Sequence, residues 1–230
     1  FDEKIELNRQ VNVTLEAMAQ AMFREMCLPD DDEELEEGWE WRKIGDLVDT
    51  ISNTYKFKDI NDIIFLNTGD VSKGFVQHHN YRPTKGLPGQ AKKRIQKGDI
   101  LYSEIRPKNK RYAYVNFDAE DYVVSTKLMV LRSKEIIDTM YIYFYLTQND
   151  VIAKLQQLAE SRSGTFPQIT FTQLKNVDIP IPSNDILNKF LTFLKPAYEK
   201  IYQNHQENLE LSKSRDLLLP KLMSGEIEVE

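Results

Sequence analysis

The sequence predicts an α+β protein in which a domain with a curled, largely antiparallel sheet lies between two long helices. Three observations support this fold class. A helical pattern in the first 26 residues recurs 196 positions later, in 197–222. Short runs rich in β-branched and aromatic residues alternate with Gly, Pro and Asn between 38 and 182. Two helical stretches, Met140–Thr147 and Asp150–Ser161, lie among those runs, which is typical of a mixed domain.

The first helix is predicted over residues 2–27, because apolar side chains recur there at spacings of three and four, with no Gly or Pro before Pro29. A second helix is predicted from Ser183 or Asn184 to about Lys195, where Pro196 should break or kink it. A further segment should continue to about Met223, with Ser224-Gly225 as its C-cap. An amphipathic helix of this length needs a partner for its apolar stripe, and each copy of the repeat is the obvious partner of the other.

The repeat itself predicts which side chains meet. Seven positions are identical in the two copies: Glu3/Glu199, Lys4/Lys200, Ile5/Ile201, Asn8/Asn204, Gln10/Gln206, Asn12/Asn208 and Leu15/Leu211. The helices are predicted to pair through Ile5, Val11, Leu15, Met18 and Met22 of the first copy and Ile201, Leu211 and Leu218 of the second. The four repeated asparagines either lie in this seam, where a buried Asn can fix the register, or face solvent in a polar stripe.

The chain is predicted to divide into a helix at 1–28, an acidic linker at 29–37, a mixed domain at 38–182, and the distal helices with the C-terminal tail at 183–230. Within the domain, strands are expected at Ile63–Leu66, Asp99–Ile105, Tyr112–Phe117, Tyr122–Leu131 and Val177–Ile181. A long polar loop is expected over Val76–Ile95, and such loops on a rigid scaffold often carry recognition.

The charge of the chain is uneven. The net charge is −6, but eleven Lys and Arg between Lys73 and Arg111 face only Asp99 and Glu104. A local excess of this size is the electrostatic pattern of a surface that contacts phosphates, and tyrosines are interleaved with it. The alternative is a solvated basic surface without a partner. Arg reads guanine and Asn or Gln reads adenine in the major groove, and Ser or Thr contacts phosphate.

The residues predicted on these grounds to contact DNA are Lys73, Gln77, His78, Asn80, Tyr81, Arg82, Lys85, Lys92, Lys93, Arg94, Arg106, Lys108, Lys110, Arg111, Arg162, Ser163 and Thr165.

Candidate catalytic chemistry is weak throughout the chain. The Asn/Asp-Pro-Pro-aromatic signature of adenine methyltransferases, a dinucleotide-binding glycine loop and a P-loop are all absent. His78 and His79 are adjacent, so they point apart in an extended segment and do not form a simple metal site; no metal is predicted. Asp99 and Glu104 faintly resemble a nuclease carboxylate pair, but Gly98-Asp99-Ile100-Leu101 fits better as a turn that leads into a strand. Cys27, the single cysteine, fits a reducing compartment, and no membrane segment is predicted.

A series of motifs in this order resembles the specificity subunit of type I restriction–modification enzymes. They are the first helix from Phe1 to Ala19, Gly38-Trp39 followed by Lys43-Ile44-Gly45-Asp46, Lys97-Gly98-Asp99-Ile100-Leu101-Tyr102-Ser103, Ser163-Gly164-Thr165 with Ile169, Val177-Asp178-Ile179-Pro180-Ile181-Pro182, and Leu217 to Glu226. Asn184-Asp185 stands where the family usually has Glu-Gln. Only one recognition domain is present, so the resemblance implies a half or partial subunit: helix, target-recognition domain, helix.

The resemblance implies that the two helices pack antiparallel as a spacer and docking platform, and that the domain reads one half of a split DNA target. It implies no catalysis by this chain and no cofactor of its own. Separate modification subunits would bind S-adenosylmethionine and methylate adenine, and a motor-bearing restriction subunit would cleave, all in the cytoplasm. Two copies of a natural half subunit could form a homodimer. The alternatives are a helical protein-interaction adaptor without DNA specificity and an enzyme that acts on nucleic acid.

Overall fold

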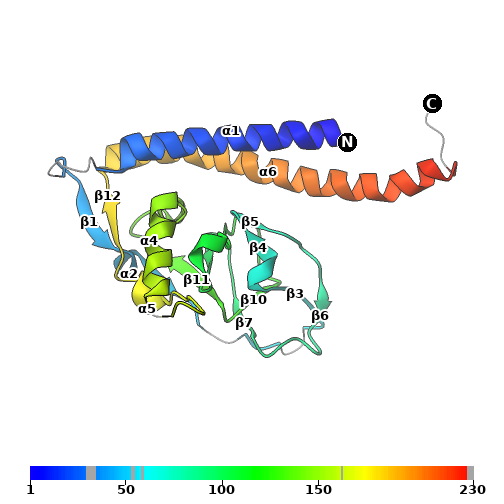
Figure 1. The fold of residues 1–230 in the computed structure, drawn as a ribbon, viewed down its shortest axis with the longest axis horizontal. Coiled ribbons are helices and arrows are strands. Elements are labelled where there is room, and N and C mark those ends of the chain that lie inside the picture. The colour runs from blue at the N-terminus through cyan, green and yellow to red at the C-terminus, as the bar shows by residue number, and fades with distance from the viewer. Residues whose placement is uncertain (30–34, 53–54, 58–59, 162, 227–230) are drawn as a thin grey trace. The chain divides into compact units, whose positions relative to one another are not determined.

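The computed structural model describes residues 1–29, 35–52, 55–57, 60–161 and 163–226 (Figure 1). The chain divides into two compact units, one formed by Phe1–Glu34 with Pro182–Glu230 and the other by Leu35–Ile181. The fold class is confirmed: long helices accompany a mixed α/β unit whose sheets are largely antiparallel. Asp30–Glu34, which make up most of the predicted acidic linker, lie outside the described residues.

The first unit is a pair of helices, α1 (Asp2–Cys27) and α6 (Asn184–Met223), which lie side by side in Figure 1. They run antiparallel, because Asp2 at the start of α1 forms an ion pair with Arg215 near the end of α6. The predicted break at Pro196 is wrong, since α6 is continuous through this residue. Proline removes one backbone donor, and Leu194 and Ala197 near it in the helix are buried.

The seam between α1 and α6 is close to the predicted one, with one error. Ile5 and Ile201 are buried, and the predicted partners Val11, Leu15, Met22, Leu211 and Leu218 are partly buried. Met18 is 47% exposed, so its placement in the seam is wrong. The next residue, Ala19, is fully buried instead, as is Phe23, whose ring contacts Phe190 edge-on with centroids 5.4 Å apart. At this turn of α1 the residue that packs in the seam is therefore one position later than predicted.

The second unit contains two four-stranded sheets. In spatial order, the first sheet consists of β6 (Arg82–Pro83), β3 (Asp62–Leu66), β10 (Tyr122–Ser125) and β7 (Ala91–Arg94). The second sheet consists of β2 (Val48–Thr50), β11 (Leu128–Ser133), β8 (Ile100–Ser103) and β9 (Tyr112–Tyr114), again in spatial order. All neighbours are antiparallel except β10 and β3. Two small pairs complete the strands: β1 (Glu40–Lys43) with β12 (Asp178–Ile181), and β4 (Val71–Ser72) with β5 (Phe75–Val76).

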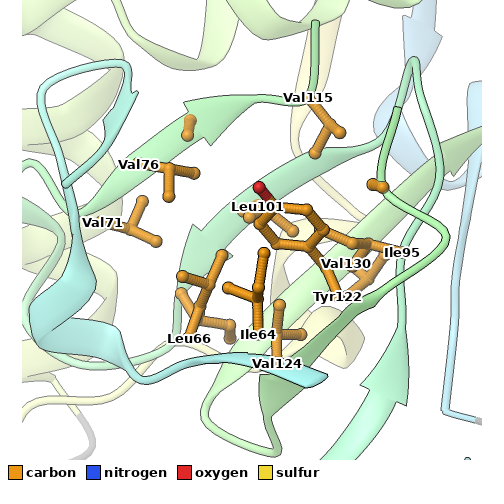
Figure 2. Packing of buried hydrophobic residues seen from close by; sticks show 13 residues of the cluster. Ile64, Leu66, Val71, Val76, Ile95, Leu101, Val115, Tyr122, Val124 and Val130 are labelled. Carbon is orange, nitrogen blue, oxygen red and sulfur yellow. The ribbon is translucent and has the colours of Figure 1, made fainter. Parts of the chain in front are cut away.

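One apolar core joins the two large sheets. Ile64, Leu66 and Val124 from the first sheet pack in the same cluster as Leu101 and Val130 from the second, as Figure 2 shows. The opposite face of the first sheet has its own small cluster, built on Phe65 and Val123 and covered by Tyr55, Phe57 and Leu87. The first sheet is therefore buried on both faces, which explains why β3 is a continuous apolar run rather than an alternating one.

Two predictions for this unit need correction. The single run Tyr122–Leu131 is two strands, β10 and β11, which belong to different sheets. The predicted loop Val76–Ile95 contains β6 and β7, which form the two edges of the first sheet. These short edge strands could not be recognised in the sequence, because their lysines, arginines and proline are typical of loops as well as of sheet edges.

The helices of this unit are α2 (Ile44–Leu47), α3 (Thr139–Leu146), α4 (Asn149–Glu160) and α5 (Phe171–Leu174), with the 3-10 turns η1 (Thr68–Asp70) and η2 (Pro107–Asn109). The helices predicted at Met140–Thr147 and Asp150–Ser161 correspond to α3 and α4. Every residue of α3 from Met140 to Leu146 is buried, and the Tyr141 hydroxyl donates to the carbonyl of Pro180 at 2.6 Å.

Candidate nucleic-acid interface

A turn formed by η2 and its flanking residues brings five of the predicted DNA-contacting residues into one region. The β4–β5 hairpin turn lies against it, because the backbone N–H of Lys73 donates to the carbonyl of Lys110 at 2.8 Å. The next residue of this turn, Gly74, donates its backbone N–H to the carbonyl of Tyr112 at 2.9 Å. The guanidinium of Arg111 lies beside η1, since a Cβ at Gly69 would be 3.6 Å from its Nη1. We call Lys73, Arg106, Lys108, Lys110 and Arg111 the basic turn cluster.

Three members of the basic turn cluster have left-handed backbones. Lys73 and Arg106 have φ of 45° and Lys110 has φ of 52°. This conformation costs a non-glycine residue about 1–2 kcal/mol, so it persists only where surrounding contacts hold it. The hydrogen bond from Arg106 N to the carbonyl of Pro167 at 3.1 Å, and that from Lys110 N to Pro107 at 2.9 Å, provide such contacts. The sequence has no signal for this conformation, since glycine is the residue that usually indicates it.

The charges of this cluster are largely unneutralised. In the described part of the chain, Lys73, Arg106, Lys110 and Arg111 form no ion pair, and Lys108 lies 3.9 Å from Glu160. Neutral groups orient two of the side chains: Lys110 Nζ donates to Asn149 Oδ1 at 2.8 Å, and Arg106 Nη2 donates to the carbonyl of Thr165 at 3.3 Å. Cations held in place by neutral acceptors keep their charge available to an anion.

A second group of basic residues lies on the edge strands of the first sheet. Arg82 on β6 places its guanidinium 5.9 Å from the ring centre of Phe65, and Arg94 on β7 lies 5.4 Å from that of Tyr55. These strands occupy opposite edges of the sheet, so the two arginines are not neighbours. Lys85 is exposed and Lys92 is partly buried.

The polar segment before β6 divides into anchored and exposed residues. Gln77 donates to the carbonyl of Phe75 at 3.2 Å, and His78 Nε2 lies 3.6 Å from Asp70 Oδ2. Asn80 and Tyr81 are exposed, and the Tyr81 hydroxyl donates to Asp121 at 2.8 Å, which raises the pKa of Tyr81. The neighbouring His79, which was not predicted as a contact, packs edge-on against Phe117 and Tyr122.

Lys93 is a correction to the predicted set. Its side chain is buried, and its ammonium donates to the carbonyls of Thr126 at 3.0 Å and Leu128 at 2.8 Å. Burial lowers the pKa of Lys93, with the charge of Lys127 adding to the effect and that of Glu104 opposing it. An ammonium that is enclosed and already paired with backbone carbonyls is not available to a phosphate. Side chains of β7 alternate between inward and outward, and Lys93 points inward. Because three basic residues follow one another here, the sequence does not show this alternation.

The segment around residue 163 is only partly described. Arg162 lies outside the described residues. Ser163 Oγ accepts a hydrogen bond from the backbone N–H of Phe166 at 3.1 Å, so it closes a turn. Thr165 is exposed, and its carbonyl is the acceptor that orients Arg106.

The carboxylates that resembled a nuclease pair are part of the structural framework. Asp99 is fully buried and bound by Arg132, a residue that the sequence reasoning missed. Glu104 forms an ion pair with Lys127 at 3.3 Å. Across the described residues, no group of three or more His, Cys, Asp or Glu is arranged to hold a metal ion. None of the described helices is long and apolar enough to cross a membrane.

Comparison with known proteins identifies the family to which the chain belongs. The family model for the type I restriction modification DNA specificity domain matches residues 36–213, well over half of the chain. The chain therefore belongs to the type I restriction–modification DNA specificity family.

Particular relatives agree with this assignment. The HindI specificity subunit of Haemophilus influenzae is 42% identical over 176 residues, which cover 76% of this chain and 38% of that protein. The MjaIX specificity subunit of Methanocaldococcus jannaschii is 27% identical over 250 residues, covering all of this chain and 57% of the relative. The chain thus spans between about two fifths and three fifths of the length of these relatives.

Solved structures show the same fold at low sequence identity. The S subunit from M. genitalium matches with a TM-score of 0.63 and 17% identity, over 96% of this chain and 57% of that one. The HsdS subunit from Thermoanaerobacter tengcongensis matches with a TM-score of 0.55 and 19% identity, over 96% and 53%.

Proposed function

We propose that the unit Leu35–Ile181 reads one half of a bipartite DNA target as the recognition domain of a type I specificity subunit. The observation that carries the proposal is the basic turn cluster. Four of its five cations have no acidic partner among the described residues, and three stand on left-handed backbones held by neutral contacts. Such fixed charges suit contacts to phosphates, which set the position and orientation of a protein on DNA.

The residues that would read bases are the exposed ones that follow Lys73 of that cluster in sequence, Asn80 and Arg82 above all. Amide and guanidinium groups recognise adenine and guanine edges in the major groove. Tyr81, held to Asp121, lies between them in the chain and is 61% exposed.

The chain itself has no catalytic role in this proposal. The helix pair α1–α6 serves as a spacer between half-sites and as a docking surface for modification subunits, which bind S-adenosylmethionine and methylate adenine. A restriction subunit carries out cleavage, and the assembly works in the cytoplasm. The names of the relatives as specificity subunits support this division of labour. A homodimer of this chain would bring two copies of the recognition domain to two half-sites.

Selection of bound oligonucleotides, with the modification subunit present, tests the proposal and identifies the half-site. Affinity for the selected DNA should then fall steeply with salt, because each phosphate contact releases about one counterion. Arg106→Ala, Lys110→Ala and Arg111→Ala should each lower the slope of log affinity against log salt by about one.

The matched control is Lys175→Ala, which removes an exposed cation of the same unit that lies outside the predicted set. Its salt slope should equal that of the parent. Binding without sequence preference and without a steep salt dependence would instead favour the protein-interaction adaptor, and a DNA product formed by the purified chain with Mg²⁺ would favour the enzyme.

A further inference from the structure

The pairing of α1 with α6 has a local two-fold relationship at four asparagines. In the repeat, Asn8 corresponds to Asn204 and Asn12 to Asn208. Asn8 Nδ2 donates to Asn208 Oδ1 at 2.9 Å, and its counterpart Asn204 Nδ2 donates to Asn12 Oδ1 at 2.8 Å. The two hydrogen bonds are therefore related by the repeat: exchanging the two helices turns one bond into the other. The same relationship holds in an interface between two identical subunits.

The same symmetry extends to the backbone. Asn12 Nδ2 donates to the carbonyl of Ile201 at 3.2 Å, and Asn208 Nδ2 donates to the carbonyl of Ile5 at 3.4 Å. Ile5 and Ile201 are themselves equivalent in the repeat. The four asparagines, which we call the asparagine quartet, thus form four amide hydrogen bonds between the two helices. Asn204 Oδ1 is buried without a hydrogen-bond partner among the described residues.

The two-fold relationship is broken at one position. Asn8 Nδ2 also donates to Glu207 Oε2 at 2.8 Å, and Lys4 lies 3.5 Å from the same carboxylate. The residue of α1 that corresponds to Glu207 is Val11, which offers no such acceptor. The bond from Asn8 lowers the pKa of Glu207, so this end of the quartet includes an ionised group.

We propose that the asparagine quartet fixes the register of α1 against α6 and is therefore the positioning device of the spacer. Asn8 and Asn204 are 3% and 1% exposed, so neither amide can obtain its hydrogen bonds from bulk water. A buried polar group that loses its hydrogen-bond partner destabilises the state that contains it. Registers that take the asparagine amides away from their acceptors are therefore disfavoured at each site.

The heptad spacing of the seam positions does not by itself make this choice. Seam positions recur every seven residues, as Ile5, Asn12 and Ala19 do on α1, so a shift of one heptad keeps seam positions facing each other. After such a shift, Asn8 would face Ile201 and Asn204 would face Ile5. In the opposite shift, Asn204 would face Ala19. The observed register differs from both shifted ones because it pairs the asparagines with one another and places Phe23 on Phe190. Fixing the register is the best established use of a buried Asn between helices.

The consequence for function rests on the proposed function. A one-heptad shift moves one helix along the other by about 10 Å, which is close to three base pairs of DNA. A spacer with an uncertain register would therefore accept half-sites at more than one separation. The quartet is expected to restrict the subunit to one spacing.

Thiol cross-link trapping measures the register directly. In a Cys27→Ala background, Asp2→Cys with Arg215→Cys, joined by a short bis-maleimide, reports the observed register. Arg215 Nη1 donates to Asp2 Oδ1 at 2.8 Å, and the linker takes the place of the long arginine side chain. Lys4→Cys with Lys200→Cys and Asp2→Cys with Leu222→Cys report the two one-heptad shifts. With the quartet intact, the first pair should close and the other two should not. With all four asparagines changed to Leu, the shifted pairs should close at least about tenfold more, while the melting temperature rises.

The control is Gln10→Leu with Gln203→Leu. These amides are exposed, and within the described part of the chain they donate only to Glu6 and Glu199 of their own helices, so trapping should not change. If the Leu quartet aggregates, Asn12→Ala with Asn204→Ala removes one amide pair without adding apolar bulk. Unchanged trapping in that variant would overturn the proposal. Trapping that shifts while the complex keeps its half-site spacing would retain the register role and remove the link to DNA spacing.

Discussion

Arg132 binds the carboxylate of Asp99 through two parallel hydrogen bonds, Nε to Oδ1 and Nη2 to Oδ2, both 2.8 Å long. Asp99 is fully buried, and it also accepts a bond from the backbone N–H of Gln96 at 2.8 Å. The hydrogen bond raises the pKa of Arg132, the guanidinium of which stays charged. Asp99 precedes β8 and Arg132 is on the neighbouring β11, so the pair fastens the turn at Gly98 to the second sheet.

Arg132→Leu should destabilise the domain strongly, because it leaves a buried carboxylate without its cation. The expected loss is about 3–5 kcal/mol in the free energy of unfolding measured with urea. Lys108→Ala is the control, since its ion pair with Glu160 is exposed and long, and it should cost under about 1 kcal/mol. Equal losses in the two variants would show that the buried pair adds nothing to stability.

Lys73 offers a test of the left-handed turn that is separate from its charge. Lys73→Gly and Lys73→Ala both remove the ammonium, but glycine adopts φ of 45° without strain. The Gly variant should therefore be more stable than the Ala variant by about 1 kcal/mol in chemical denaturation. Both should weaken DNA binding equally. A more stable Ala variant would contradict the left-handed assignment at this position.

The correction at Met18 leads to a contrast within α1. Phe23→Ala should lower the free energy of unfolding by about 3–5 kcal/mol, because it removes a fully buried ring that packs on Phe190. Met18→Ala, at an exposed position, should change it by no more than about 0.5 kcal/mol. Thermal or urea unfolding of the two variants measures both changes in stability. A large loss in Met18→Ala would contradict the exposed position of Met18 and support the seam predicted from the sequence.

Cys27 gives a pH-dependent prediction. Burial raises the pKa of its thiol to about 12, so the folded state favours the neutral form. A pKa that is higher in the folded state than in the unfolded state gives stability that is complete below the unfolded value, near 9, and is lost as the pH rises toward 12. Melting temperatures of the parent should therefore fall over this range more steeply than those of Cys27→Ala.

The raised pKa values of Tyr114 and Tyr145, both about 12, produce a further decline above about pH 10 in parent and variant alike. Comparison of the two proteins isolates the thiol. Identical pH profiles would show that Cys27 ionises as readily in the folded chain as in the unfolded one.

Local patterns in the sequence determined the elements whose character depends on near neighbours. The three-and-four spacing of α1 predicted its limits at Asp2 and Cys27 closely, and α3, α4 and β12 follow from equally local runs. The repeat also predicted that the two long helices meet, because an apolar stripe repeated in the same chain requires a partner. The family resemblance, confirmed by the match over residues 36–213, came from short motifs in a fixed order.

Tertiary structure alone decided the features that depend on residues far apart in the chain. Lys93 turns inward because its strand pairs with β10, and the carbonyls of Thr126 and Leu128 then receive its ammonium. Asp99 finds Arg132 only after β8 and β11 are in register. The sequence contains the asparagines of the helix seam, but their bonds exist only in one alignment of α1 with α6. Periodicity is a property of a segment, whereas burial and register are properties of two segments brought together.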